Sequence, residues 1–282
     1  MRQGKFTGFE LSAHDPGIAL IQFNEPARLN GMTQAMKRDL VETLLQAQMD
    51  DSVRVVVFTG SGRAFSAGDD ISGHARGSGG ASERLMSSIP PGHDTPIGTY
   101  EGLRGLSQPL NLAVRNLDKL CIAALNGVAI QTGFSLALAC DFRIAAASCR
   151  LGMPEITVGI PSVIQAALLP GLIGWGRTAE LLLGGRPVDA REAEGWGLVN
   201  RAVEDGALDE EVERWVERLL ALPPDALRLQ KALLARWRRV DLDTVVALSM
   251  DTFVRAYATG EPQQAMQAFL DRRRAGARPT EA

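Results

Sequence analysis

The chain has 282 residues, of which 45% are hydrophobic and 22% charged, a composition typical of a globular protein with a core of its own. Its formal net charge of −3 argues against a nucleic-acid partner, although a small phosphate ligand could still find a local basic pocket. The three cysteines lie in apolar stretches, which indicates buried, reduced thiols, and no spacing suggests a metal site. The first residues lack a signal-peptide core and no run reaches the ~18 apolar residues of a membrane span, so we expect a cytoplasmic protein.

The first part of the chain alternates strands and helices. Residues 6–13 and 17–23 flank a turn and predict a β-hairpin. Thr33 is expected to cap the next helix. The apolar face of that helix is predicted to contain Met36, Leu40, Leu44 and Leu45. Residues 53–59 form a continuous apolar run typical of a buried strand, so a βαβ unit is expected here.

Residues 72–99 are rich in Gly, Ser and Pro, which is typical of a disordered insertion or an active-site flap. Because the stretch follows the strongest motif of the chain, we expect the flap. A helix is then predicted from about Tyr100 to Leu117. The elements that follow are a strand at 119–125, a helix at 132–139 and a strand at 141–146. After Pro161 we expect almost only helices, among them 162–169 and 177–183. The predicted organisation is an α/β core, residues 1–205, and a helical C-terminal region, residues 206–282.

Two turns that follow buried strands, residues 62–71 and 126–135, carry the main chemical signal. Small residues in each turn allow a ligand to approach the backbone closely. A turn that opens a helix leaves N–H groups unpaired beside the positive end of the helix dipole. If both turns face one point, they form an oxyanion hole that stabilises the oxygen of an enolised thioester. Taken alone, the same residues would also fit two turns packed only for compactness.

Five blocks resemble, in order, the motifs of the enoyl-CoA hydratase/isomerase (crotonase) family. They are NEPARLNGM at 24–32, AFSAGDDI at 64–71, NGVA…ACD at 126–141, MPEITVGIP at 153–161 and AEGWGLV at 193–199. Five blocks in one order over about residues 6–275 are specific, although none is decisive alone. The resemblance implies an α/β crotonase-like (ClpP/crotonase) fold, with a ββα-repeat spiral core and an α-helical C-terminal trimerisation region.

By this resemblance, the backbone N–H groups of Asp69 and Thr132 form the oxyanion hole. The family's glycine triplet reads Gln131-Thr132-Gly133 here. A backbone donor needs glycine only where φ is positive, so the hole can persist with a narrower pocket, unless it has been remodelled. The residues expected to contact CoA or substrate are Arg28, Leu29, Gly31, Ala67, Gly68, Asp70, Ile71 and Gly133. For Asp70 a turn cap, and for Arg28 a solvated side chain, are the alternatives.

Two acid positions decide the reaction. Related enoyl-CoA hydratases carry two glutamates, of which this chain keeps Glu155 and replaces the other by Ser135. A serine cannot exchange a proton near neutral pH, whereas hydration by two carboxylates uses both. One glutamate suffices for a double-bond isomerase. A hydratase or hydratase-lyase could use Glu155 with a water on Ser135, a pattern similar to that of hydroxycinnamoyl-CoA hydratase-lyases. The alternative from another class is an inactive CoA-binding or assembly member.

The expected partner is an acyl-CoA thioester, and since coenzyme A is part of that substrate we expect no separate cofactor. No nicotinamide-binding or serine-hydrolase motif is present in a fitting context. We also expect a homotrimer or homohexamer. The family resemblance supplies the threefold symmetry, and apolar positions in the C-terminal helices suit contact with a neighbour: Val245, Leu248, Met250 and Phe253.

Overall fold

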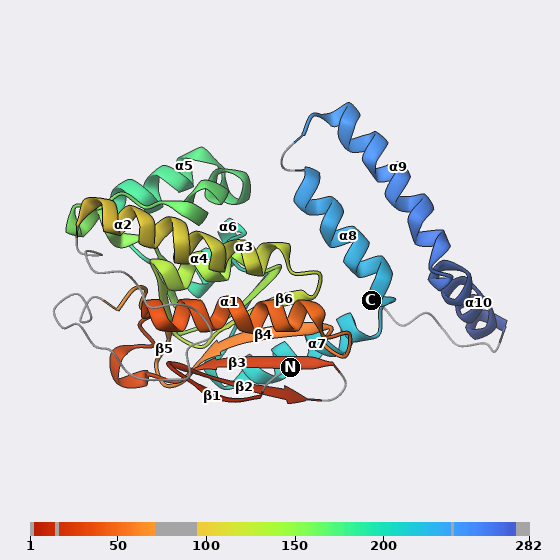
Figure 1. The fold of residues 1–282 in the computed structure, drawn as a ribbon, viewed down its shortest axis with the longest axis horizontal. Helices are drawn as coiled ribbons and strands as arrows, with labels where there is room; N and C mark the ends of the chain where they lie inside the picture. Colours follow the sequence, from red (N-terminus) through yellow and green to blue (C-terminus); the bar gives the residue numbers. More distant parts are fainter. Residues whose placement is uncertain (1–2, 15–16, 71–94, 238–239, 275–282) are drawn as a thin grey trace. The chain divides into compact units, whose positions relative to one another are not determined.

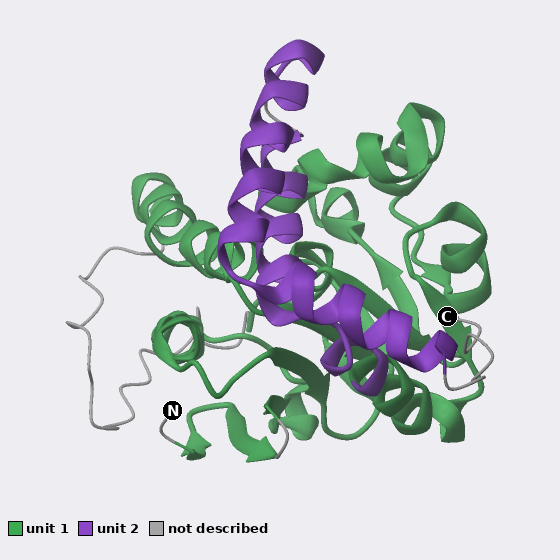
Figure 2. Cartoon of the chain, turned by 90° about the vertical axis from the view of Figure 1, so that its right-hand side faces the viewer, with its two compact units in different colours: residues 1–216 green, residues 217–282 purple. Residues whose placement is uncertain are grey.

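The computed structural model describes residues 3–14, 17–70, 95–237 and 240–274 of the chain (Figure 1). These residues fall into two compact units, residues 1–216 and residues 217–282 (Figure 2). The first unit contains both β-sheets, and the second is made of helices. The assignment of functions to a core of residues 1–205 and a C-terminal region stays a prediction.

A seven-stranded sheet forms the larger layer of the first unit, in the order β1-β2-β3-β4-β6-β8-β11. The strands are β1 (Gly4–Phe6), β2 (Phe9–His14), β3 (Ile18–Phe23), β4 (Val55–Gly60), β6 (Leu120–Leu125), β8 (Phe142–Ala146) and β11 (Arg201–Val203). The expected hairpin is the antiparallel pair β2–β3, and from β3 onward neighbouring strands run parallel. Because β6 is buried at every position, both its faces are covered, which explains its unbroken apolar sequence.

A second sheet has the order β10-β9-β7-β5. It consists of β5 (Ala64–Ser66), β7 (Val128–Ile130), β9 (Arg150–Gly152) and β10 (Val188–Asp189). Three times the chain places one strand in the large sheet and the next in the small sheet before it continues into helical structure, which is the expected ββα repeat. The prediction of almost only helices after Pro161 is wrong at β10 and β11, because strands of two or three residues show no period in the sequence.

Helix α1 (Gln34–Met49) begins as predicted, with the Thr33 hydroxyl accepting a hydrogen bond from the Met36 N–H at 3.1 Å. Met36, Leu40 and Leu44 are buried, whereas Leu45 is 57% exposed and was wrongly assigned to the apolar face. The buried stripe continues from Leu44 to Ala47, and this spacing of three to four residues leaves Leu45 at the edge.

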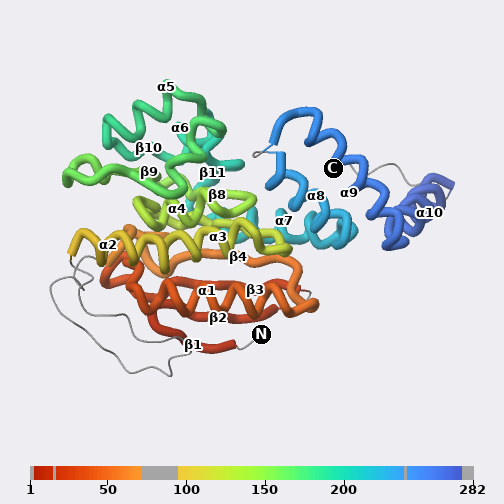
Figure 3. Tube along the Cα trace, turned by 45° about the horizontal axis from the view of Figure 1, so that its top comes forward, coloured from red at the N-terminus to blue at the C-terminus, as the bar shows by residue number. Residues whose placement is uncertain are grey.

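The next helical segment begins at Pro96 and not near Tyr100, because the Thr95 hydroxyl caps it by accepting from the Gly98 N–H at 3.1 Å. It comprises α2 (Pro96–Gly102), a π-helical turn (Leu103–Ser107) and α3 (Gln108–Asn116). Helix α3 lies beside α1 (Figure 3). The expected flap at 72–99 falls almost entirely outside the described residues.

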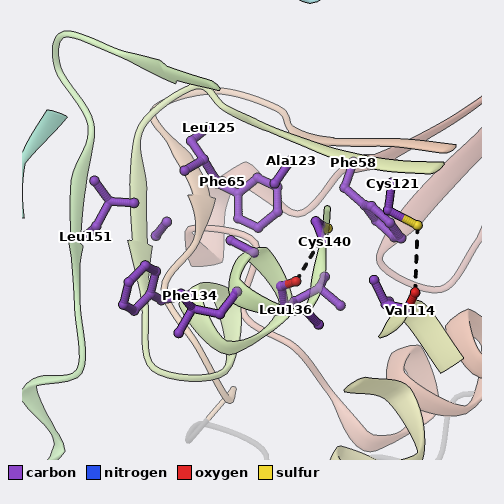
Figure 4. Close-up of a cluster of buried hydrophobic side chains, with 14 of the residues drawn as sticks. Phe58, Phe65, Val114, Cys121, Ala123, Leu125, Phe134, Leu136, Cys140 and Leu151 are labelled. Atoms are coloured by element: carbon purple, nitrogen blue, oxygen red, sulfur yellow. Dashed lines mark hydrogen bonds between the residues drawn. The ribbon is translucent and has the colours of Figure 1, made fainter. Parts of the chain in front are cut away.

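The remaining helices of the first unit are α4 (Thr132–Ala139), α5 (Leu169–Gly184), α6 (Ala190–Trp196) and the beginning of α7 (Leu208–Leu220). The two helices expected at 162–169 and 177–183 are instead a 3-10 helix (Ile164–Leu168) followed by α5, which kinks at Gly174. Aromatic side chains and two cysteines meet in the core: Phe58, Phe65, Phe134, Cys121 and Cys140 (Figure 4). All three cysteines are buried and none forms a disulfide, as predicted.

The second unit contains α8 (Pro224–Trp237), α9 (Leu242–Ala258) and α10 (Glu261–Arg274). The Glu261 carboxylate ties the unit together by accepting from the N–H groups of Asp225 and Ala226, both at 2.9 Å. Two of the four apolar residues expected to suit a neighbour, Met250 and Phe253, are exposed.

Candidate active site

The sequence motifs meet where three neighbouring parallel strands of the small sheet end. Strand β7 pairs with β5 on one side and β9 on the other. Because parallel strands end at the same edge of a sheet, the segments after them converge there. These segments hold Asp69 after β5, Thr132 and Ser135 after β7, and Glu155 after β9. The fold therefore brings together residues spread over more than eighty positions.

The backbone of the first turn is hydrogen-bonded to the backbone of residues 29–32. The Ala67 N–H donates to the Leu29 oxygen at 2.9 Å, and the Met32 N–H donates to the Gly68 oxygen at 2.8 Å. Gly68 has φ +96°, a conformation that glycine adopts without steric cost. A Cβ on Gly31 would lie 3.3 Å from the Asp70 Cβ, so the two segments pack closely. The segments 28–32 and 67–70, which hold six of the residues expected to contact CoA, thus form one structural unit.

Asn30 holds this unit in place, a role that the sequence did not reveal. Its side chain is fully buried, and its Nδ2 donates to the backbone oxygens of Ser61 and Ala64 at 2.9 and 2.7 Å. Its φ is +56°, which asparagine tolerates better than most residues. Asn30 is therefore a framework residue of the loop, whereas its neighbours remain candidates for ligand contact.

Arg28 is engaged by two carboxylates. Its Nη1 lies 2.8 Å from the Asp70 Oδ2, and its Nη2 lies 3.1 Å from the Glu25 Oε2. The guanidinium remains partly exposed, so these pairs contribute little stability and can rearrange. A CoA phosphate near Arg28 would share it with Asp70, which pairs with this arginine. Ile71, the last residue expected at this turn, lies outside the described part of the chain.

The second turn begins with Gln131, whose backbone has φ 55° and ψ −125°. Its side chain crosses to the first turn, where the Asp69 N–H donates to the Gln131 Oε1 at 3.1 Å. The start of α4 has no side-chain cap, so Thr132 is the first residue of a helix whose opening N–H groups need an external acceptor. The two N–H groups expected to form the oxyanion hole therefore lie on adjoining turns.

Gly133 allows α4 to start close to β5, and Ser135 lies in the first turn of the same helix. A Cβ on Gly133 would lie 2.4 Å from the backbone oxygen of Ser66, so the helix can start this close to β5 only with glycine there. The Ser135 N–H donates to the Gln131 oxygen at 2.8 Å. Ser135 itself is buried in the first turn of this helix.

Glu155 lies in a 3-10 helix (Pro154–Val158) directly after β9. It is 9% exposed, and its Oε2 accepts a hydrogen bond from the Ser162 hydroxyl at 3.0 Å. Burial raises the pKa of this carboxyl above its ordinary value, and the charge of Asp69 raises it further, against the opposing effect of hydrogen bonds from the backbone and Ser162. A raised pKa suits a group that takes up and releases protons near neutral pH.

A buried lysine of α1 forms an ion pair with Asp69 in the first turn. Lys37 of α1 is 4% exposed, and its Nζ lies 2.7 Å from the Asp69 Oδ1 and 2.9 Å from the Ser107 hydroxyl. The only sequence signal for this contact was a lysine on the apolar side of the α1 helix. The partner, Asp69, could not be identified from spacing because it lies on another element.

Two further properties bear on the class of protein. Within the described ranges, no helix combines the length and apolar character needed to cross a membrane. The same residues hold no group of three or more His, Cys, Asp or Glu side chains that could bind a metal ion.

Known proteins share this fold over most of the chain. The family model for enoyl-CoA hydratase/isomerase matches residues 13–89 and 92–276. The chain therefore belongs to the enoyl-CoA hydratase/isomerase, or crotonase, family, and it is an enzyme of that family. The crystal structure of an enoyl-CoA hydratase from Bacillus anthracis has a TM-score of 0.84 at 30% identity and covers 94% of this chain and 96% of that chain. The predicted fold class and family are thus confirmed.

Relatives with different activities are similar to this chain to nearly the same degree. A crotonyl-CoA hydratase of Syntrophomonas wolfei is 30% identical over 260 residues, which is 92% of this chain and 93% of the relative. A 1,2-epoxyphenylacetyl-CoA isomerase of Escherichia coli is 30% identical over 266 residues, or 94% and 96% of the two chains. A putative enoyl-CoA hydratase from Thermobifida fusca, solved in complex with CoA, has a TM-score of 0.74 at 33% identity and covers 89% and 93%. Overall similarity alone does not select one reaction.

Proposed function

We propose that this enzyme acts on an acyl-CoA thioester by enoyl-CoA hydratase/isomerase chemistry, with Glu155 as the principal acid/base. The observation that carries the proposal is the burial of Glu155 beside the two donor turns, which raises the pKa of its carboxyl. A solved relative with CoA bound supports the choice of ligand. The pKa direction also argues against an inactive member, because it prepares a carboxyl for proton transfer.

The thioester oxygen would sit at the turns that carry Asp69 and Thr132. When Glu155 removes the proton next to the thioester carbonyl, the C–H electron pair forms a double bond to the carbonyl carbon, and the displaced C=O π pair leaves negative charge on the oxygen. Backbone N–H groups aimed at that oxygen stabilise the charge, and one such donor is worth about 3–4 kcal/mol in a shielded site. In an isomerisation, Glu155 returns the same proton to the far end of the conjugated system.

A second candidate is hydration or hydratase-lyase chemistry, as in the hydroxycinnamoyl-CoA enzymes. It is favoured by the position of Ser135, which is buried in the first turn of α4 next to the Thr132 donor. The Ser135 hydroxyl would hold a water that Glu155 deprotonates as the water oxygen adds to the carbon β to the thioester. The enolate formed by this addition then takes the proton back from Glu155 at the α carbon. Names among the relatives include both hydratases and an isomerase.

Replacement of Glu155 by Gln tests the proposal, because the shape is kept and proton transfer is removed. We expect the turnover number on the best substrate of an enoyl-CoA panel to fall by about 10²–10⁴-fold, with acyl-CoA binding nearly unchanged. Near-normal turnover in E155Q would mean that another group moves the proton. Glu180→Gln, on a side chain that is 57% exposed, is the matched control and should behave as the wild type.

Ser135→Ala separates the two candidate reactions. If serine holds the attacking water, the variant loses hydration by about tenfold or more, because an oriented water is lost. In an isomerase the same change has almost no effect on turnover. Measuring both reactions on one enoyl-CoA substrate decides between them.

We also propose a homotrimer or a homohexamer of two trimers. The support is the exposure of apolar residues on α9, among them Met250 and Phe253, which are 61% and 65% exposed. Apolar faces of this kind mark contact surfaces between proteins. Sedimentation at micromolar concentration should show the oligomer, and a monomer would contradict it.

A further inference from the structure

The side-chain amide of Gln131 occupies the first donor of the proposed oxyanion hole. The Asp69 N–H donates to the Gln131 Oε1 at 3.1 Å. Because a backbone N–H can only donate, this contact determines the orientation of the amide group: its oxygen faces Asp69, and its Nε2 faces away. The Asp69 N–H is therefore engaged by the Gln131 side chain in this structure.

Hydrogen bonds hold both the backbone and the side-chain amide of Gln131. At the backbone, the Gln131 N–H donates to the Gly152 oxygen at 3.0 Å, and the Gln131 oxygen accepts from the Ser135 N–H at 2.8 Å. The φ of 55° is unfavourable for a residue with a side chain, and such strain persists only where the surroundings enforce it. At the tip, the Asp69 N–H fixes the amide.

Gly68 provides the space for this side chain. A Cβ on Gly68 would lie 2.3 Å from the Gln131 Oε1 and 2.6 Å from the Gln131 Cβ. The amide therefore packs directly on the backbone of the first turn and spans the gap between the two donor segments. Among the residues that the structure describes, none accepts a hydrogen bond from the Gln131 Nε2, and the residue is only partly buried.

We propose that the Gln131 Nε2, and not the Asp69 N–H, donates to the thioester oxygen together with the Thr132 N–H. This inference rests on the proposed function. It keeps the Thr132 N–H as one donor to the thioester oxygen and replaces the Asp69 N–H by the Gln131 Nε2. Side-chain amides serve as oxyanion donors as well as backbone N–H groups do, and a donor that is already fixed needs no reorganisation during the reaction. The bond from the Asp69 N–H to Oε1 also polarises the amide and makes its N–H a stronger donor.

Gln131→Met tests the inference, because methionine has a similar length and cannot donate. We expect the turnover number to fall by about 10²-fold, the effect of losing one oxyanion donor, while binding of free CoA is unchanged. Difference infrared spectra of a bound acyl-CoA with a ¹³C-labelled carbonyl should show a smaller shift of the carbonyl band than in the wild type. This band reports the hydrogen bonds to the thioester oxygen directly.

Gln48→Met is the matched control. Gln48 is also partly buried, and its Oε1 accepts a backbone N–H, that of Asp118, at 3.0 Å near the end of α1. This variant should retain wild-type turnover and carbonyl shift. A loss in Q131M but not in Q48M then excludes a general effect of replacing a bridging glutamine.

Gln131→Gly provides a second variant that the positive φ favours, so it should fold even if Q131M does not. It removes Nε2 but frees the Asp69 N–H, and we expect a turnover number between those of Q131M and the wild type.

A turnover number in Q131M or Q131G at or above that of the wild type, with a lower KM, would overturn the inference, because the substrate would then simply displace the side chain. E155Q keeps the two proposals separate: if E155Q loses turnover while Q131M does not, only this inference fails.

Discussion

The two turns that meet at the site reach positive φ with different residues. In the first turn Gly68 has φ +96°, and in the second turn Gln131 has φ 55°. Glycine adopts such a conformation without steric cost, whereas glutamine is held there by its neighbours. Each turn carries one of the N–H groups that the resemblance assigns to the oxyanion hole, that of Asp69 in the first turn and that of Thr132 in the second.

The difference shows that the two positions act as a pair. The side chain at 131 fits only because position 68 has none, since a Cβ there would fall 2.3 Å from the Gln131 Oε1. A single glycine at the contact is thus enough, and the second turn could exchange its glycine for a polar side chain.

The largest effect on this arrangement is expected from Gly133→Ala. The new methyl group would lie 2.4 Å from the Ser66 backbone oxygen, and neither backbone can yield easily. Overpacking of this kind costs about 1–3 kcal/mol, and a shift of Thr132 by about 1 Å could lower turnover by about 10²-fold. Thermal unfolding and steady-state kinetics measure the two effects.

Gly171→Ala is the control for that variant. Gly171 is also helical, in α5, but a Cβ there would have no atom within 4 Å. This variant should be as stable as the wild type or slightly more so, since alanine favours a helix by about 1 kcal/mol over glycine. Equal stability of G133A and G171A would mean that α4 is free to move away from β5.

A smaller loss of stability is expected from Gly68→Ala, because the new methyl group would meet the Gln131 side chain, which can move more easily than a backbone. The positive φ alone costs about 1 kcal/mol, and Gly197→Ala, at φ +82° with its nearest atom at 3.7 Å, measures that part. The remainder of the loss in G68A comes from Gln131. We expect Q131G to restore stability to G68A more than it changes the wild type, a coupling that a double-mutant cycle measures. Additive effects would show that residues 68 and 131 do not act together.

The sequence predicted the elements that are long enough to show a pattern. The hairpin β2–β3, the strands β4 and β6 and the cap at Thr33 follow from apolar runs and local hydrogen bonding within a few residues. The short strands β5, β7 and β9 could not be predicted, because three residues show no period. The family motifs nevertheless marked the turns after those strands, since the motifs depend on residue identity and not on periodicity.

The contacts that refine the site lay beyond local sequence reasoning. Gln131 and Asp69 are 62 positions apart, so no local pattern shows that the side chain at 131 reaches the backbone at 69. The Lys37–Asp69 pair likewise joins two elements whose relative position only the fold determines. Glu155 was identified from its motif, but its Ser162 partner and the burial that raises its pKa required the structure.

The smallest expected effect concerns that partner. The Ser162 hydroxyl donates to the Glu155 Oε2 at 3.0 Å and so favours the charged carboxylate, which lowers its pKa against the effect of burial. Ser162→Ala removes this contribution, so the pKa of Glu155 rises further above its ordinary value. Because the base must be deprotonated to act, the acidic limb of the kcat/KM profile should move to higher pH. The plateau at higher pH should change by at most about tenfold, the value of one hydrogen bond.

The pH dependence of stability gives a second, independent measurement of the direction in which the pKa of Glu155 moves in S162A. A carboxyl whose pKa is raised by folding binds its proton more tightly in the folded state, so its contribution is fully present below the pKa of the unfolded chain and is lost as the pH rises through the folded value. S162A should therefore lose more stability than the wild type over that interval, and E155Q should lose none of it. Ser52→Ala, which removes a serine bond to the surface carboxylate of Asp50, should leave the activity profile unchanged. If the acidic limb in S162A moves to lower pH instead, the group it reports is not Glu155.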